Sequence, residues 1–193
     1  GYTRSARLSG GTLNLDTPDS RNIMLRRSLA ARAAPRFRRI HMRLTELILP
    51  ETVVTGLPAA SRDELLEAIV QDLDAKGLTS DRDTIARDLL ARETVMSTGV
   101  GYGVAIPHAY SDGITRLIAG LYRTLEPIPF GAPDDGAVDL FFLVLGPKES
   151  RRDHIRVLAR ISRLISHGDF REDLRRAENA DAVTAVLRRF GER

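Results

Sequence analysis

Gly99-Val-Gly-Tyr-Gly-Val-Ala-Ile-Pro-His108 is the stretch that decides how this chain folds and where its chemistry lies. Three glycines alternate, and a short apolar run then ends in Pro107 and a single histidine. Glycine permits backbone conformations that other residues avoid and lets the chain approach its neighbours closely. The run Val104–Ile106 has the length of a short buried strand. We therefore expect His108 to lie where a strand ends, beside a flexible loop, a position that suits a reactive imidazole.

The composition excludes several classes of protein and site. The chain of 193 residues has no cysteine, which excludes disulfides and thiolate metal sites. No apolar run approaches about 18 residues, so we expect no membrane-spanning helix. The length suits one domain with an appendage, and it is sufficient to bury a proper core.

The net charge of +3 is the sum of two unlike parts. Residues 1–41 hold nine arginines and two aspartates, a balance of +7, which leaves −4 for residues 42–193. We predict that residues 1–41 are a basic tail, disordered or not native, that residues 42–193 are the domain, and that Met42 is the natural start. A transit peptide and a native partner-binding extension are the alternatives for the tail. The acidic domain argues against a nucleic-acid footprint.

Local signals predict alternating helices and strands in the domain. Ser61 and Glu64 form a capping-box pattern that opens a helix, Gly77 ends it, and Asp81 caps the next helix. Val138–Leu145 is nearly continuously apolar, as in a strand buried on both faces. The predicted helices are 62–76, 82–95, 151–167, 170–177 and 180–190, the predicted strands are 104–107, 115–125 and 138–145, Pro127 and Pro129 mark a loop, and 132–136 is a turn. This order predicts an α/β fold, a single layered domain with a mixed β-sheet flanked by α-helices.

The residues around the glycines carry a resemblance to a known family. Residues 91–109 read A-R-E-T-V-M-S-T-G-V-G-Y-G-V-A-I-P-H-A. This string resembles the phosphorylation motif of the enzyme IIA domain of the bacterial phosphotransferase system, fructose/mannitol type (type 2). A second match follows in residues 138–145 and 153–162, and the resemblance covers about residues 43–190. Tyr102 departs from the family, which more often has a small or polar residue there.

The resemblance implies a role for particular residues. It implies that His108 accepts a phosphoryl group from the phosphohistidine of a small histidine-containing carrier protein. His154 would orient His108 or donate a hydrogen bond to the phosphoryl oxygens. Arg92 would meet those oxygens, since its planar guanidinium suits them. The remaining candidates for supporting the phosphoryl group and its loop are Ser97, Thr98, Gly99, Gly101 and Gly103.

Several of these residues also have a structural interpretation. Arg92 can stabilise the C-terminus of its helix without binding an anion. Ser97 and Thr98 can cap the loop. We expect His41 and His167 to be structural or incidental.

The sequence does not support other nucleotide-binding or metal-binding motifs. The glycines of 99–103 do not match the dinucleotide-binding pattern, because a predicted helix stands where a strand should precede them. No P-loop is present in the sequence, which argues against direct use of ATP. A zinc site built from His108 and His154 lacks further ligands at recognisable spacing, so we expect no metal and no cofactor.

The predicted function is that of a cytoplasmic phosphocarrier and regulatory protein of the nitrogen-regulatory type. Its downstream partners would be regulatory target proteins or a IIB component, with no nucleic acid and no insertion into a membrane. Residues 127–139 resemble the regulatory branch somewhat more than the sugar-transport branch. The alternatives are a fructose/mannitol-type IIA for sugar transport and a non-catalytic binding module of the same fold; whether the chain counts as an enzyme stays open.

Overall fold

The computed structural model describes residues 43–191, so the tail expected at residues 1–41 lies outside the described residues, as does His41. The helices are α2 (Leu44–Leu47), α3 (Arg62–Ala75), α4 (Arg82–Val95), the short 3₁₀ helix η1 (Lys148–Ser150), α5 (Arg151–Ile165), α6 (Gly168–Arg176) and α7 (Ala180–Gly191). The strands are β1 (Ile48–Leu57), β2 (Gly99–Gly101), β3 (Val104–Ala105), β4 (His108–Tyr110), β5 (Ile118–Ile128) and β6 (Val138–Gly146). Across residues 43–191, no helix has the length and apolar character needed to cross a membrane.

The strands form one mixed sheet, as the sequence predicted. Their order is β1-β5-β6-β3-β2, with β1 parallel to β5, β5 antiparallel to β6, and β2 antiparallel to β3. β3 and β4 pair one after the other with β6, both in parallel, so that Val104 lies opposite Leu140 and His108 lies opposite Val144. Pro107 falls in the break between these two short strands, because proline has no N–H to donate to a ladder.

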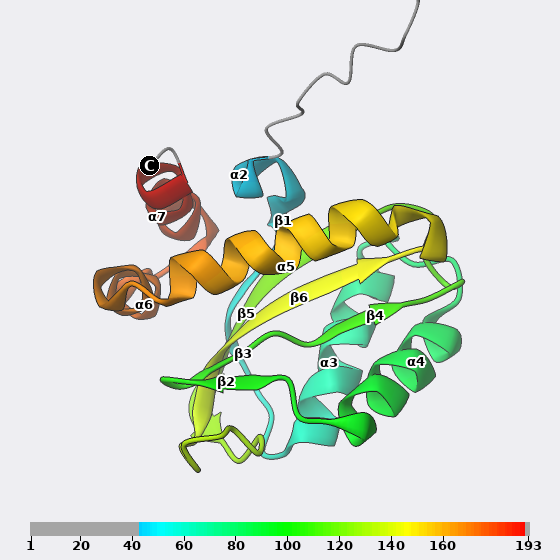
Figure 1. The fold of residues 1–193 in the computed structure, drawn as a ribbon, viewed down its shortest axis with the longest axis horizontal. Helices are drawn as coiled ribbons and strands as arrows, with labels where there is room; N and C mark the ends of the chain where they lie inside the picture. Colours follow the sequence, from blue (N-terminus) through cyan, green and yellow to red (C-terminus); the bar gives the residue numbers. More distant parts are fainter. Residues whose placement is uncertain (1–42, 192–193) are drawn as a thin grey trace, which may run out of the picture. The chain divides into compact units, whose positions relative to one another are not determined.

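Helices cover both faces of the sheet. In Figure 1, α5, α6, α7 and α2 lie on one side of the strands, and α3 and α4 lie on the other. Alternate side chains of β6 serve the two faces, since Phe142 and Val144 belong to the core under α5 whereas Phe141 and Leu143 belong to the core under α3. This double burial explains why the run 138–145 is apolar throughout.

The predicted helix boundaries agree closely with the structure. Ser61 caps α3 by accepting a hydrogen bond from the Glu64 N–H at 3.3 Å. The Glu64 carboxylate accepts from the Ala60 N–H at 2.9 Å, one residue before the position that a regular capping box uses. Gly77 follows the helix with φ of +67°, a conformation in which glycine is favoured. Asp81 caps α4 through the Thr84 N–H at 3.1 Å.

Two predicted strands differ from the structure. The strand expected over 104–107 is interrupted, and His108 begins β4 instead of following the end of a strand. β5 starts at Ile118 and continues through Pro127, which the sequence placed in a loop. Proline is tolerated there because the pairing of β5 with β6 is irregular between Arg123 and Ile128.

Besides β4, which lies beyond the strand expected over 104–107, two more strands were not predicted. β1 contains Pro50 and Glu51, which hide its apolar positions, and its pairing with β5 is irregular over that same part. β2 consists of two glycines and a valine, and glycine has a low preference for strands. Pairing with neighbouring strands, and not local preference, makes both segments extended.

Candidate functional site

The site lies at the edge of the sheet, where β4 runs between α4 and α5 (Figure 1). A pocket of about 320 Å³ opens there, and each of the three elements contributes side chains to it. Its lining residues are Asp88, Ala91, Arg92, His108, Ala109, Tyr110, His154 and Leu158. Three predicted site residues, from distant parts of the sequence, therefore meet in one pocket: Arg92, His108 and His154.

The ring of His108 is held in one orientation by the backbone before it. Its Nδ1 lies 2.7 Å from the carbonyl oxygen of Ile106. Because a carbonyl can only accept, Nδ1 carries the hydrogen, and Nε2 of the neutral ring keeps its lone pair. Burial lowers the pKa of His108 below its usual value, and the positive charge of Arg92 acts in the same direction. The Ile106 carbonyl and the Glu93 carboxylate oppose this shift only in part, so the ring is neutral near pH 7.

His154 lies near the start of α5 and is completely buried. Its ring centroid is 5.9 Å from that of His108 and 4.5 Å from that of Tyr110. Within residues 43–191, neither ring nitrogen has a hydrogen-bond partner, which is unusual for a buried polar group. Burial lowers the pKa of His154 to about 4, and the neighbouring His108 adds to the shift. The ring is therefore neutral, with one N–H donor uncommitted beside the pocket.

Arg92 lies in the last turn of α4. Its Nη1 donates to the Met96 carbonyl at 2.9 Å, a bond that closes the C-terminal end of the helix. This bond uses one of the five N–H donors of a guanidinium, and the group is close enough to His108 to affect its pKa. Arg92 thus caps its helix and also places a positive charge beside the histidine.

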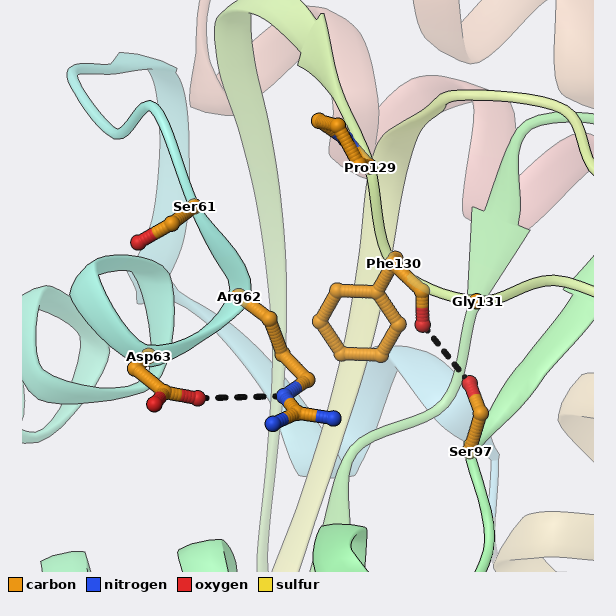
Figure 2. Close-up of a pocket in the computed structure, with 7 residues that line it drawn as sticks. All are labelled: Ser61, Arg62, Asp63, Ser97, Pro129, Phe130 and Gly131. Atoms are coloured by element: carbon orange, nitrogen blue, oxygen red, sulfur yellow. Dashed lines mark hydrogen bonds and ion pairs between the residues drawn. The ribbon is translucent and has the colours of Figure 1, made fainter.

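Ser97 and Thr98 do not line this pocket. The Ser97 hydroxyl donates to the Phe130 carbonyl at 2.8 Å and accepts from the Gly99 N–H at 3.1 Å. Figure 2 shows the bond from Ser97 to Phe130 in a second pocket, of about 330 Å³, which residues 61–63 at the start of α3 also line. Thr98 donates from both its N–H and its hydroxyl to the Glu93 carboxylate. Both hydroxyl groups are therefore engaged in holding the loop.

The glycines of the motif shape the hairpin between β2 and β3. Gly101, Tyr102 and Gly103 all have positive φ, at 84°, 57° and 73°, and form its turn. A Cβ on Gly103 would lie 2.5 Å from a nitrogen of Arg175, so only glycine fits there without displacement. The exposed Tyr102 ring lies under the Arg171 guanidinium, 4.4 Å away. These residues lie outside the lining of the His108 pocket, as does the exposed His167 at the start of α6.

Sequence reasoning missed three residues around the site. Tyr110 lies two residues after His108 on β4, so it shares its strand face, and its ring packs against His154. Asp88 lies one helical turn before Arg92 and lines the pocket beside it. Glu93 is 3% exposed although it follows Arg92 on a helix with a polar composition. Strand alternation and helical spacing point to the first two, whereas no local signal marks Glu93 as buried.

Comparison with known proteins places the chain among phosphotransferase components. The family model described as "Phosphoenolpyruvate-dependent sugar phosphotransferase system, EIIA 2" matches residues 46–190. A "Nitrogen regulatory protein" of Bradyrhizobium diazoefficiens is 37% identical over 149 residues, which cover 76% of this chain and 95% of that protein. A "PTS system fructose-specific EIIA component" of Haloferax volcanii is 36% identical over 130 residues, which cover 67% and 84%.

Solved structures of related proteins have the same fold. Nitrogen regulatory protein IIA-Ntr from Neisseria meningitidis matches with a TM-score of 0.70 at 31% identity, over 75% of this chain and 98% of that one. IIA mannitol from Escherichia coli matches with a TM-score of 0.63 at 20% identity, over 72% and 98%, a likeness of fold alone.

Proposed function

Because the chain belongs to the EIIA 2 family of the phosphoenolpyruvate-dependent sugar phosphotransferase system, we propose that it is a phosphocarrier of the nitrogen-regulatory type whose acceptor is His108. The 2.7 Å hydrogen bond between His108 Nδ1 and the Ile106 carbonyl carries this proposal. It assigns the hydrogen to Nδ1 and leaves Nε2 as the nucleophile, in a ring that burial keeps neutral.

The transfer step balances without a cofactor. The Nε2 lone pair of His108 forms the new nitrogen–phosphorus bond. The phosphorus–nitrogen bond of the donor phosphohistidine breaks, and its electron pair returns to the donor ring. Nδ1 of His108 keeps its proton, which stays bound to the Ile106 carbonyl. In such a step the protein contributes positioning and electrostatic stabilisation.

Two residues of the pocket would offset the charge of the phosphoryl group, roughly two negative charges. Arg92 supplies a fixed positive charge on the α4 side. His154 on the α5 side is neutral and has an N–H with no other partner among the described residues. An N–H donor held rigidly in a buried site interacts with an anion without reorganising.

The surface next to the pocket suits docking of a protein donor. Val95 and Met96 follow Arg92 at the end of α4 and are 81% and 70% exposed. Ile155 follows His154 on α5 and is 54% exposed. An exposed apolar patch is a common protein contact, and we propose these three side chains as part of the docking surface. The donor would be a histidine-containing phosphocarrier protein, and the acceptor a regulatory target or a IIB component. A solved complex of a related mannitol IIA contains a phosphorylated IIB.

A labelling experiment tests the acceptor. The chain is incubated with phosphoenolpyruvate and the general phosphotransferase proteins, and incorporated phosphate is counted. We expect one phosphoryl group per chain, in an acid-labile bond, and no labelling of His108→Ala. His167→Ala is the matched control, because it removes an exposed histidine outside the pocket. Full labelling of His108→Ala would reject the acceptor assignment, and absence of labelling in every form would favour the non-catalytic binding module.

Sugar transport is the second candidate, favoured by the similarity to the fructose-specific component of Haloferax volcanii. A pull-down from native extract with wild type, His108→Ala and His108→Glu separates the two branches. In the regulatory branch, phosphorylation changes the bound partners, and the glutamate mimics this only in part because it carries one charge. An identical bound set for all three forms, with the wild type verified as phosphorylated, would reject the regulatory branch.

A further inference from the structure

Glu93 is a buried carboxylate to which the transfer step assigns no role. It lies in the last turn of α4 and is 3% exposed. Its Oε1 accepts the Thr98 N–H at 2.8 Å, and its Oε2 accepts the Thr98 hydroxyl at 2.7 Å. Burying a carboxylate is costly unless donors compensate it. Here both compensating donors belong to one residue, so the end of α4 is tied to the start of the glycine hairpin.

The same hydrogen-bonded chain continues to the histidine. The Thr98 carbonyl accepts the Ile106 N–H at 3.0 Å. The Ile106 carbonyl in turn accepts the Nδ1–H of His108 at 2.7 Å. Glu93 is thus joined to the His108 ring through two intervening residues, each of which uses both a donor and an acceptor.

Ile106 depends on this bond because it lies in the break between two strands. β3 ends at Ala105 and β4 begins at His108, and the next residue, Pro107, has no N–H. The ladder to β6 resumes where the Pro107 carbonyl accepts the Val144 N–H. Within residues 43–191, the Ile106 N–H is therefore directed to Thr98 and not to β6. The position of the Ile106 carbonyl therefore follows the position of Thr98.

We propose that Glu93 is a positioning residue for His108, which acts through Thr98 and Ile106 to fix the ring tautomer that leaves Nε2 free. The proposal rests on the proposed function of His108 and extends it to a residue that does not touch the phosphoryl group.

The same geometry affects the phosphorylated ring. Once Nε2 is bonded to phosphorus, the ring keeps the Nδ1 proton as a cation or loses it. The Ile106 carbonyl can bind Nδ1 only while that proton is present, so a carbonyl held in place favours the cation. In onward transfer the cationic ring leaves as a neutral imidazole, which departs more readily than an imidazolate. The charged and titratable groups around His108 are Asp88, Arg92 and Glu93 from α4, His154 from α5 and Tyr110 from β4. Among them, the negative charge of Glu93 raises the pKa of His108, and the positive charge of Arg92 lowers it.

The tautomer can be measured without any phosphotransfer. Nitrogen-15 NMR of the full-length chain, with labelled histidine, reports which ring nitrogen of His108 carries hydrogen. We expect the Nδ1–H form in the wild type and mixed forms in Glu93→Ala. Phosphorylation of Glu93→Ala should be about tenfold to a hundredfold slower, the scale of a small misplacement of a reacting group.

Variants at Thr98 keep the test decisive if Glu93→Ala does not fold. Thr98→Val removes the hydroxyl bond and keeps the N–H bond, so we expect a smaller change in the same direction. Thr98→Ser restores the hydroxyl and should restore the wild-type tautomer and rate. Thr94→Val is the matched control, because the Thr94 hydroxyl binds the Leu90 carbonyl within α4 and lies outside the chain of bonds.

Three outcomes separate the possibilities. A wild-type tautomer in folded Glu93→Ala, or in Thr98→Val if the alanine variant does not fold, overturns the proposal. Slower phosphorylation with an unchanged tautomer also overturns it, because Glu93 would then act by another route. If the tautomer changes in Glu93→Ala but the wild type is never phosphorylated in the labelling experiment, Glu93 positions the ring and the proposed function is rejected.

Discussion

Replacing His154 by leucine should change how the stability of this protein depends on pH. The pKa of the buried ring is about 4, against an ordinary value of 6.5. Between these two values the unfolded chain binds a proton that the folded chain does not, so stability is lost as the pH falls from about 6.5 to about 4. The linkage relation gives a loss of about 2.5 kcal/mol by pH 4.5 from this residue alone.

The substitution should also change the stability at neutral pH. Both ring nitrogens of His154 lack a partner among residues 43–191, and a buried polar group in that condition costs about 1–3 kcal/mol. Leucine has no polar atom and a similar volume. We therefore expect His154→Leu to be at least as stable as the wild type at pH 7 and slower in phosphotransfer. Such a result would mean that the buried histidine is retained for function at a cost in stability.

Thermal or urea unfolding between pH 7 and pH 4.5 is the assay. A difference of about 2.5 kcal/mol corresponds to a melting temperature about 5–10 °C apart for a domain of this size. The wild-type curve should fall more steeply than that of His154→Leu, while the carboxylates common to both cancel in the difference. His167→Leu reports the effect of losing an exposed imidazole. Parallel curves for the wild type and His154→Leu would refute the reasoning.

Three further predictions concern other parts of the chain. Arg92→Ala should slow labelling by about tenfold to a hundredfold, since one fixed donor to the anion is lost; equal rates in both directions of transfer would show that Arg92 only caps its helix. Gly103→Ala should cost at least about 1 kcal/mol, because φ is 73° and the new methyl group meets a side chain, and an unchanged melting temperature would contradict that account. Removal of residues 1–41 should leave labelling unchanged and the melting temperature within about 5 °C, because the segment is strongly basic and poor in large apolar residues; a larger drop would mean that the segment packs on the domain.

Local signals were sufficient for much of the fold. Ser61 and Asp81 cap α3 and α4 as predicted, because a cap joins a side chain to a backbone N–H three residues away. The apolar run 138–145 is the central strand β6, buried on both faces as predicted. The residues of a helix turn or a strand repeat lie close in sequence, so their pattern is visible before the chain folds.

The motif also led to His108, Arg92 and His154, which line one pocket. That result depended on resemblance to a family and not on spacing, since His154 lies 46 residues after His108 and no local rule brings them together. The structure adds the hydrogen bond that assigns the His108 tautomer and the burial that keeps both rings neutral.

Only the tertiary structure decided where strands form without local preference and which donor meets which acceptor. β1 is extended because β5 lies beside it, and Ser97 and Thr98 bind Phe130 and Glu93 because the fold places those groups next to them. Glu93 reads as one more polar residue on a solvated helix, yet it is buried. The physical reason is that helix and turn signals arise from neighbours in the sequence, whereas burial and hydrogen-bond partners depend on the packing of distant segments.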